Sequence, residues 1–253
     1  MKNLFVINIL DLICFMLIFI GITMYIYSQI KARKNHNLPI KKDENHHFAI
    51  LIPARDESLV IEGLLKSIKE QSLAIPMKDV YMIVEDINDP TVMINAKYGV
   101  STIVRKHLEL KRKGYALDEA IKEILSKNKK YDAYFIFDAD NILDKDYMFN
   151  MVKSYDMGYD FGIGYRNCKN GNDSVVAVCS SLTFSMINTI SNETKRLRTN
   201  TMTISGTGFY IRGYLIERWG GYPFYSLTED YELSLYANLY GLTTDYNKKA
   251  VFF

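Results

Sequence analysis

Short apolar runs alternate with amphipathic stretches from residue 48 to about residue 137, and this alternation constrains the fold more than any other feature of the chain. The apolar runs predict buried strands, and apolar positions three and four residues apart predict helices. We expect strands at residues 48–52, 80–84, 101–105 and 133–137. We expect helices at residues 59–71, from the turn at residues 86–90 to about residue 98, and at residues 115–126. Alternating strands and helices favour an α/β fold with a mainly parallel, Rossmann-like sheet flanked by helices.

Polar clusters follow three of the predicted strands, at residues 53–57, 85–89 and 138–140. Ligands of open parallel sheets bind beyond the carboxyl ends of the strands. We therefore expect the three clusters to converge at one rim of the sheet. The chain contains no Walker A loop, dinucleotide-binding glycine fingerprint, G-x-S-x-G motif or H-E-x-x-H motif.

The third cluster contains two carboxylates, Asp138 and Asp140, one residue apart after an apolar run. Side chains at positions i and i+2 of a strand point the same way, so both carboxylates leave the sheet edge together. Oxygen ligands in this arrangement suit Mg²⁺ or Mn²⁺, and such a metal most often holds a diphosphate. On these residues alone, a strand followed by an acidic turn explains the pattern equally well.

The segment of residues 4–27 is almost wholly apolar. As a helix it would be about 36 Å long, enough to cross a hydrocarbon core of about 30 Å, and it is too long for the apolar region of a signal peptide. Five basic residues follow it between positions 31 and 42 but only Lys2 precedes it, so the positive-inside rule places the rest of the chain in the cytoplasm. Asp11 interrupts the segment; it either faces a polar partner or reaches the membrane interface.

These boundaries predict a transmembrane anchor at residues 1–30, a basic polar linker at residues 31–47 and one α/β domain at residues 48–253. The formal charge of +2 gives no indication of nucleic-acid binding. The three cysteines form no C-x-x-C pair, which suits a reducing compartment. The apolar residues around 184–190 are expected in the core, and a membrane-facing helix is the alternative.

Six short motifs follow one another in the domain: Ile-Pro-Ala-Arg-Asp-Glu at residues 52–57, Val-Glu-Asp at 84–86, Lys-Gly-Tyr-Ala-Leu at 113–117, Asp-Ala-Asp at 138–140, Ser-Gly-Thr-Gly-Phe at 205–209 and Thr-Glu-Asp at 228–230. Their order and spacing resemble the family 2 glycosyltransferases of GT-A fold. The similarity points to the membrane-bound branch that includes the cellulose, hyaluronan and poly-N-acetylglucosamine synthases. It covers nearly all of residues 48–253.

The resemblance implies a donor site for a UDP-sugar. Glu85 takes the place of the acid, usually Asp, that reads the uracil edge, and Lys113 that of the basic residue facing the phosphates. Asp138 would contact the nucleotide sugar and share the divalent metal, Mg²⁺ or Mn²⁺, with Asp140. The remaining residues implied in the nucleotide cleft are Pro53, Ala54, Arg55 and Glu57.

The resemblance also implies an acceptor side. Asp230, with Glu229 beside it, corresponds to the acid that acts as general base on the acceptor hydroxyl. A helix N-cap is the alternative role for Asp230, because residues 228–232 also resemble a helix start. The residues implied beside the acceptor are Gly206, Thr207, Gly208 and Thr228.

One family motif is missing. The synthase branch carries QxxRW after Thr-Glu-Asp, whereas the only Arg-Trp pair here, Arg218-Trp219, precedes it and lacks the Gln. Because residues 250–253 also read as an interrupted strand, we expect a C-terminally truncated chain.

The function implied is an inverting, metal-dependent transfer of a sugar from a UDP-sugar to a polysaccharide or lipid-linked acceptor. The reaction would take place at the cytoplasmic face of a bacterial cell (inner) membrane. A catalytically inactive nucleotide-sugar-binding subunit is the first alternative, because QxxRW is missing. A nucleotidyltransferase is disfavoured, because residues 53–57 contain no glycine for a triphosphate loop.

Overall fold

The computed structural model describes residues 2–34, 46–171, 173–196 and 202–253. Most of the predicted linker therefore lies outside the described residues. The strands are β1 (Phe48–Pro53), β2 (Val80–Val84), β3 (Ser101–Val104), β4 (Ala133–Ile136), β5 (Phe161–Arg166), β6 (Phe209–Arg212) and β7 (Thr244–Phe252). The helices are α1 (Lys2–Lys34), α2 (Ile61–Lys69), η1 (Met77–Asp79), α3 (Pro90–Tyr98), α4 (Lys113–Ser126), α5 (Tyr147–Asp156), α6 (Val175–Met186), η2 (Ile187–Glu193), α7 (Thr194–Arg196), α8 (Gly213–Trp219) and α9 (Glu229–Leu239).

The described strands form one sheet in the order β3-β2-β1-β4-β6-β5-β7. β1 pairs in parallel with β2 and β4, and β2 pairs in parallel with β3. β6 is antiparallel to both β4 and β5, while β7 is parallel to β5. The predicted strands and helices are confirmed to within two residues at each end, and the mainly parallel sheet is confirmed. Residues 250–252 are the end of β7, which pairs with β5.

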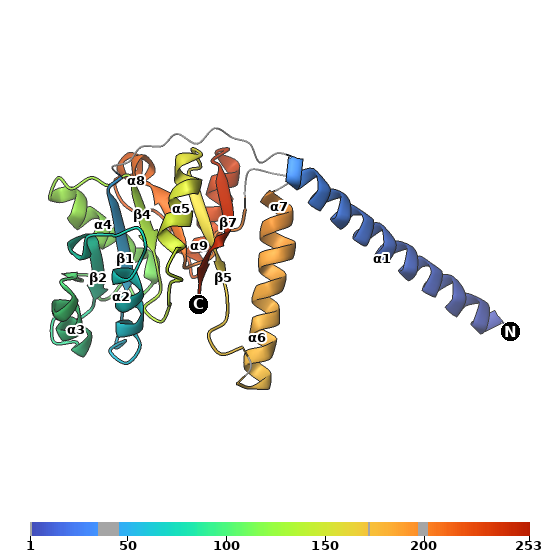
Figure 1. Cartoon of the computed structure of the whole chain (residues 1–253), viewed down its shortest axis with the longest axis horizontal. Coiled ribbons are helices and arrows are strands. Elements are labelled where there is room, and N and C mark those ends of the chain that lie inside the picture. The colour runs from blue at the N-terminus through green and yellow to red at the C-terminus, as the bar shows by residue number, and fades with distance from the viewer. Residues whose placement is uncertain (1, 35–45, 172, 197–201) are drawn as a thin grey trace.

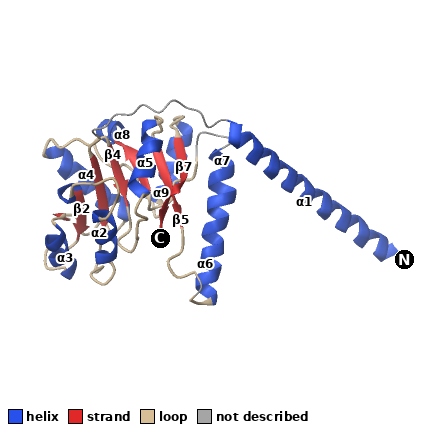
Figure 2. Ribbon diagram, viewed as in Figure 1, coloured by secondary structure: helices blue, strands red, loops and turns tan. Residues whose placement is uncertain are grey.

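Helices cover both faces of the sheet, as Figures 1 and 2 show. Successive residues of a strand point to opposite faces, so β1 supplies two cores. Phe48, Ile50 and Ile52 pack with α2 and α5 on one face, and Ala49 and Leu51 pack with α4, α8 and α9 on the other. A strand buried on both faces reads as a continuous apolar run, which is why β1, β2 and β4 are visible in the sequence.

Helix α3 shows how local residues set an element's limits. Asp89 lies at its N-cap, where the carboxylate accepts a hydrogen bond from the amide of Thr91 at 2.8 Å, and Pro90 follows at the first helical position. Gly99 ends the helix in the left-handed region, with φ of 72°. These signals explain why the turn at residues 86–90 and the helix to about residue 98 could be predicted.

Two helices of the described residues are long and apolar enough to cross a membrane. Ile9–Tyr27 of α1 has a mean hydropathy of 2.5 with every side chain exposed, and it is the predicted span. Val175–Glu193, formed by α6 and η2, has a mean hydropathy of 1.3 and is mostly exposed. Figure 1 shows α1 leaving the domain and α6 standing beside the sheet. The interpretation of residues 184–190 as core is wrong, since Met186, Ile187 and Ile190 are 45 to 60% exposed.

Two helical glycines give opposite predictions for replacement by Ala. At Gly114, in the first turn of α4, a Cβ would overlap the carbonyl oxygen of Phe224, so Gly114→Ala is expected to lower the free energy of unfolding by about 1–3 kcal/mol. At Gly63, in α2, the atom nearest to an added Cβ would be Ile142 Cδ1 at 3.6 Å. Gly63→Ala is therefore expected to raise the free energy of unfolding by about 0.5–1 kcal/mol. Urea denaturation of the two variants beside the wild type measures both. Equal effects would contradict the close approach of α4 to Phe224.

Candidate active site

The sheet topology brings four segments to one rim. The carboxyl ends of β1, β2 and β4 lie together because these strands are parallel neighbours. The antiparallel β6 begins at the same rim, so residues 205–208 lie beside the end of β4. The amide of Gly208 donates to Ile136 O at 2.9 Å, and the amide of Asp138 donates to Thr207 Oγ1 at 2.9 Å. Three of the predicted polar clusters and the predicted acceptor segment thus meet.

A cleft of about 250 Å³ opens at this rim. Every residue predicted for the nucleotide lines it: Pro53, Ala54, Arg55, Glu57, Glu85, Lys113 and Asp138. The lining is completed by Ile83, Arg105, Lys111, Arg112 and Ala116. The motifs that are separate in the sequence therefore form one concave surface.

Glu85, rather than its neighbour Asp86, faces the cleft. Its carboxylate pairs with Arg55 Nε at 3.4 Å and with Arg105 Nη1 at 3.5 Å. Asp86 instead accepts hydrogen bonds from Asn88 within its own turn. A carboxylate held between two guanidinium groups is fixed in orientation, as a reader of a base edge must be.

Arg105 supports this wall of the cleft from behind. Its side chain is 4% exposed and lies 3.7 Å from the carboxylate of Glu119. It also donates to the carbonyl oxygens of His107 and Leu110, at 3.1 and 2.6 Å. The planar guanidinium thus holds both Glu85 and the loop of residues 106–112, which the five donors of an arginine can do at once.

Lys113 connects three segments of the site. It is the first residue of α4, so the positive end of the helix dipole adds to its own charge. Its ammonium group pairs with the carboxylate of Asp138 and donates to the carbonyl oxygen of Gly206 at 2.6 Å. A cation at a helix N-terminus beside an open cleft is suited to phosphate oxygens.

Three carboxylates gather beyond the end of β4. Burial raises the pKa of Glu57, and the negative charges of Asp140 and Asp138 raise it further. Asp140 is exposed, and its carboxylate accepts only a long contact of 3.4 Å from Asn141 Nδ2 among the contacts described. The rim therefore carries negative charge that a cation would relieve.

This donor set fits a divalent metal shared with a ligand. Among the described residues, no group of three His, Cys, Asp or Glu side chains could hold a metal ion by itself. Mg²⁺ is usually held by one or two carboxylates together with substrate phosphates. Asp138 and Asp140 supply such a partial shell.

The predicted acceptor segment adjoins the Thr-Glu-Asp motif. A Cβ built on Gly206 would lie 3.4 Å from Asp230 Oδ2, so the small residue leaves the carboxylate of Asp230 room. Thr207, fully buried, also donates its hydroxyl to Asn141 Oδ1. Gly208 has a φ of 67°, and a side chain there would overlap the ring of Phe252. Position 208 therefore requires glycine both for conformation and for space.

The alternative role of Asp230 as a helix N-cap is wrong. Thr228 holds the N-cap position of α9, without a side-chain hydrogen bond, and Asp230 lies inside the first turn. Its Oδ1 accepts a hydrogen bond from the amide of Tyr231 at 2.8 Å. The second oxygen points toward Gly206, which leaves it available to a ligand.

A family comparison is decisive for the class of protein. The sequence model described as "Glycosyltransferase like family 2" matches residues 46–252, which is more than half of the chain. The chain belongs to this family. The prediction of a family 2 glycosyltransferase is confirmed. A comparison with curated protein sequences finds no match.

Solved structures with the same fold are also glycosyltransferases. Mannosyltransferase PcManGT from Pyrobaculum calidifontis, in complex with GDP-Man and Mn²⁺, has a TM-score of 0.67 at 17% identity, covering 91% of this chain and 63% of that one. S. aureus TarS has a TM-score of 0.55 at 16% identity, and the match covers 81% of this chain and 36% of TarS. Glucosyl-3-phosphoglycerate synthase from Mycobacterium tuberculosis, with Mn²⁺ and UDP, has a TM-score of 0.52 at 15% identity, covering 83% and 72%.

These neighbours confirm the GT-A fold of the family 2 domain. The chain spans less than two thirds of the length of PcManGT and about a third of that of TarS. Assignment to the membrane-bound synthase branch stays a prediction.

Sequence reasoning missed three cleft residues of this glycosyltransferase: Arg105, Lys111 and Arg112. The feature of the sequence that could have indicated them is the cluster of basic residues between positions 105 and 113. Arg112 donates to the carbonyl oxygen of Tyr225 at 2.8 Å and so ties this loop to the chain before α9.

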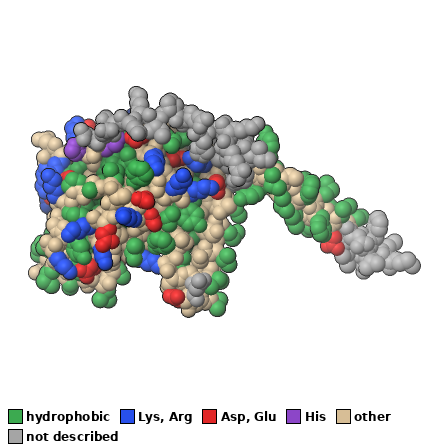
Figure 3. Space-filling model, in the orientation of Figure 1, with side chains coloured by type: hydrophobic (Ala, Val, Ile, Leu, Met, Phe, Trp, Pro, Cys, Tyr) green, Lys and Arg blue, Asp and Glu red, His purple; other side chains and the backbone are tan. Residues whose placement is uncertain are grey.

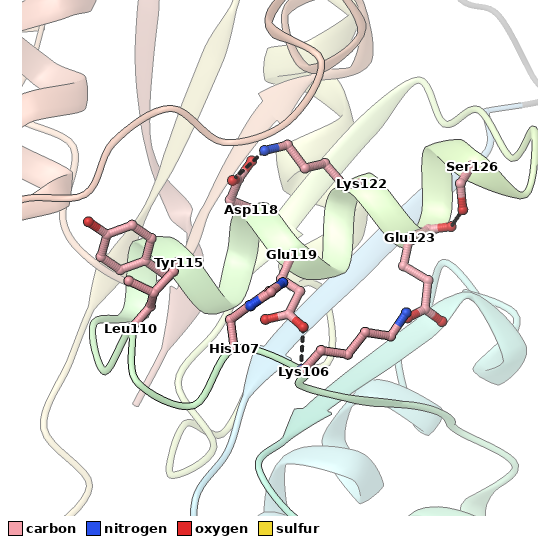
Figure 4. A pocket seen from close by; sticks show the side chains of 9 residues that line it. All are labelled: Lys106, His107, Leu110, Tyr115, Asp118, Glu119, Lys122, Glu123 and Ser126. Atoms are coloured by element: carbon pink, nitrogen blue, oxygen red, sulfur yellow. Dashed lines mark hydrogen bonds and ion pairs between the residues drawn. The ribbon is translucent and has the colours of Figure 1, made fainter.

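A second cavity of about 440 Å³ is lined by residues 106, 107 and 110 and by side chains of α4 (Figure 4). Several of its charged side chains have partners. Lys122 Nζ lies 2.8 Å from Asp118 Oδ2, and the amide of Lys106 donates to Glu119. Asp118 further accepts from the amide of Tyr222 and the hydroxyl of Tyr225, both at 2.9 Å. None of the residues predicted for the nucleotide or for catalysis lines this cavity, so it carries no catalytic assignment.

Glu229 gives the site a testable pH dependence. Burial raises its pKa above the ordinary 4.5, with Lys113 opposing and Asp230 and Asp138 reinforcing the shift. The fold therefore favours the neutral acid, and this stabilisation is full below pH 4.5 and is lost as the pH rises through the raised pKa. We expect Glu229→Gln to raise the free energy of unfolding by about 0.5–1 kcal/mol at pH 7.5 and by less at pH 5, measured by urea denaturation. Glu70→Gln, at an exposed site, is the control, and an equal gain at both pH values would contradict the role of burial.

Proposed function

We propose that this chain is an inverting, metal-dependent glycosyltransferase that moves a sugar from a UDP-sugar to a polysaccharide or lipid-linked acceptor. The observation that carries the proposal is the single cleft lined by every predicted nucleotide residue, beside Asp138 and Asp140 and next to Asp230. TarS, which shares the fold, was crystallised in complex with UDP-GlcNAc, and two other neighbours contain Mn²⁺.

On the donor side, Glu85 would accept from the base and Lys113 would contact the diphosphate. Asp138 and Asp140 would hold the metal, which supplies neutralisation of the charge that builds on the leaving diphosphate. Lys113 adds a fixed positive charge from the protein itself, reinforced by the N-terminus of α4.

On the acceptor side, Asp230 would take the proton of the attacking hydroxyl. Residues 206–208 and Thr228 would border the acceptor, and Glu229 would adjust the electrostatic field around Asp230. A base that serves the face of the sugar opposite the diphosphate leads to inversion at the anomeric carbon.

The membrane placement rests on α1. Its segment Ile9–Tyr27 would span the inner membrane, with the basic residues at positions 31, 33 and 34 on the cytoplasmic side. The bilayer is then a partner of the chain, and a lipid-linked or membrane-extruded acceptor would be within reach.

Calorimetry of the detergent-solubilised full chain tests the donor site. UDP is expected to bind with micromolar affinity, about 8 kcal/mol, in the presence of Mn²⁺, and at least ~10-fold more weakly with EDTA or with GDP in place of UDP. No binding under any metal condition would overturn the proposal. Release of UDP from UDP-N-acetylglucosamine or UDP-glucose then separates an active enzyme from the alternative, an inactive binding subunit, which would bind without turnover.

A further inference from the structure

Helices α6, η2 and α7 form one continuous rod that exposes large apolar side chains and buries polar ones. Large apolar side chains point outward: Val175, Val176, Leu182, Met186, Ile187 and Ile190, each 45 to 80% exposed. The two buried side chains among the described residues of the rod are polar, since Asn188 and Asn192 are only 3% and 4% exposed. Figure 3 shows hydrophobic side chains on the outer edge of α6, as along α1. A contiguous apolar surface of this kind marks an interaction site.

The inward side of the rod is fixed to the domain. Asn188 Nδ2 donates to the carbonyl oxygen of Arg166 at 2.7 Å, and the Arg166 guanidinium lies 4.5 Å from the centre of the Phe184 ring. Glu193 pairs with Lys248 of β7 at 2.7 Å. A helix that is held to the domain by contacts at residues 184, 188 and 193 cannot be surrounded by lipid, so its length of 19 residues does not make it a second span.

The rod also meets the proposed membrane anchor. α7 contacts α1, so the apolar surfaces of the two helices begin at a common junction, as Figure 1 shows. The junction is basic: positions 31, 33 and 34 of α1 are Lys or Arg, and Lys195 of α7 is exposed. Basic residues next to an apolar helix face suit anionic headgroups.

We propose that the outer face of Val175–Glu193 lies in the membrane interface beside α1, with its apolar side chains among the acyl chains and its polar side on the domain. This inference rests on the proposed span of α1. Continuity with α1 and the basic junction favour lipid as the molecule that covers this face. Finding a protein partner on the same face would exclude lipid.

The placement has a consequence for the acceptor. Only nine residues lie between Arg196, at the end of the rod, and Gly206 in the acceptor segment. A rod lying on the bilayer therefore keeps the acceptor side of the site close to the membrane surface. This arrangement suits an acceptor with a lipid anchor.

The native cysteines allow a direct test in vesicles of phosphatidylcholine and phosphatidylglycerol. Cys14 lies in the span of α1 and Cys179 on α6, both exposed. Full-length single-cysteine variants would keep one of them, with Cys168→Ser in each, and carry an environment-sensitive fluorophore. A cysteine-free chain with Met93→Cys, an exposed apolar site on α3 at the opposite edge of the sheet, is the matched control.

Quenching by nitroxide lipids is the readout. We expect quenching at both Cys14 and Cys179, stronger at Cys179 for a nitroxide near the headgroup than for one near the chain end, and about tenfold less at Met93→Cys. Leu182→Glu with Met186→Glu should reduce the signal at Cys179 several-fold, whereas Leu235→Glu with Leu239→Glu, at exposed sites of α9, should not.

Three results would overturn the inference. Quenching at Cys14 together with a water-like emission at Cys179 would support α1 as the membrane anchor but contradict the placement of the rod in the interface. A blue-shifted, unquenched Cys179 would show that protein covers the face. Absence of quenching at both Cys14 and Cys179 would contradict the membrane anchor in the proposed function. UDP binding would still test the donor site separately.

Discussion

Replacement of Asp230 by Asn is expected to lower kcat by about 10³-fold, or about 4 kcal/mol, and to leave the affinity for UDP unchanged. The amide fills the same space but cannot take a proton. Asp230 lies next to Gly206 rather than in the nucleotide cleft, so donor binding should not depend on it. Turnover measured as UDP release, with calorimetry of UDP on the same preparation, separates the two effects.

Glu232→Gln is the matched control, because it removes a carboxylate from the same turn of α9. Glu232 accepts a hydrogen bond from the amide of Ser226 at 3.0 Å, which the amide oxygen of Gln can also accept. We expect less than about a threefold loss of kcat. Activity of Asp230→Asn within tenfold of the wild type would assign the general base elsewhere.

The second large effect is expected for Asp140→Asn. Removing partners of metal ligands already costs about 10–100-fold in metal affinity, so loss of a ligand itself should weaken Mn²⁺-dependent UDP binding by at least ~100-fold. The residual binding should equal that of the wild type in EDTA, because the metal-independent contacts of the cleft are kept.

Asp144→Asn is the control for this experiment, because Asp144 is an exposed acid in the same loop and its carboxylate accepts a hydrogen bond from the amide of Asp146 at 3.1 Å. It should bind UDP like the wild type in calorimetry. If Asp140→Asn keeps its Mn²⁺ dependence while Asp144→Asn loses it, the metal lies further along the loop than proposed.

The half of the sheet before residue 137 could be predicted from sequence, because β1, β2 and β4 are apolar throughout and each is followed by polar residues. Parallel pairing then places those polar residues at one rim with no further information. The convergence of Glu57, Glu85 and Asp138 on one cleft followed from this logic.

The second half could not be predicted in the same way. β6 is antiparallel and lies between β4 and β5, a pairing between distant residues that periodicity does not encode. The strand β7 mixes Asp245, Asn247 and Lys248 with apolar residues. The apolar residues around 184–190 are expected in the core because composition does not tell which side of a helix faces the protein. In the structure, the polar side of this helix faces the protein.

The alternative of Asp230 as the N-cap of α9 was left open by the sequence, because Thr228 and Asp230 are only two residues apart and both are suited to that position. The entry of the chain into α9 decides it, since Thr228 holds the N-cap position. Such local geometry is set by neighbours that the sequence pattern leaves open.

Arg105 makes the shapes of the two cavities interdependent. In the loop of residues 106–112, residues 106, 107 and 110 line the larger cavity, residues 111 and 112 line the nucleotide cleft, and one guanidinium holds the loop in place. A lysine, with a single nitrogen, could not bind Glu85, Glu119 and two carbonyl oxygens together. A displacement of this loop would therefore change the lining of both cavities at once.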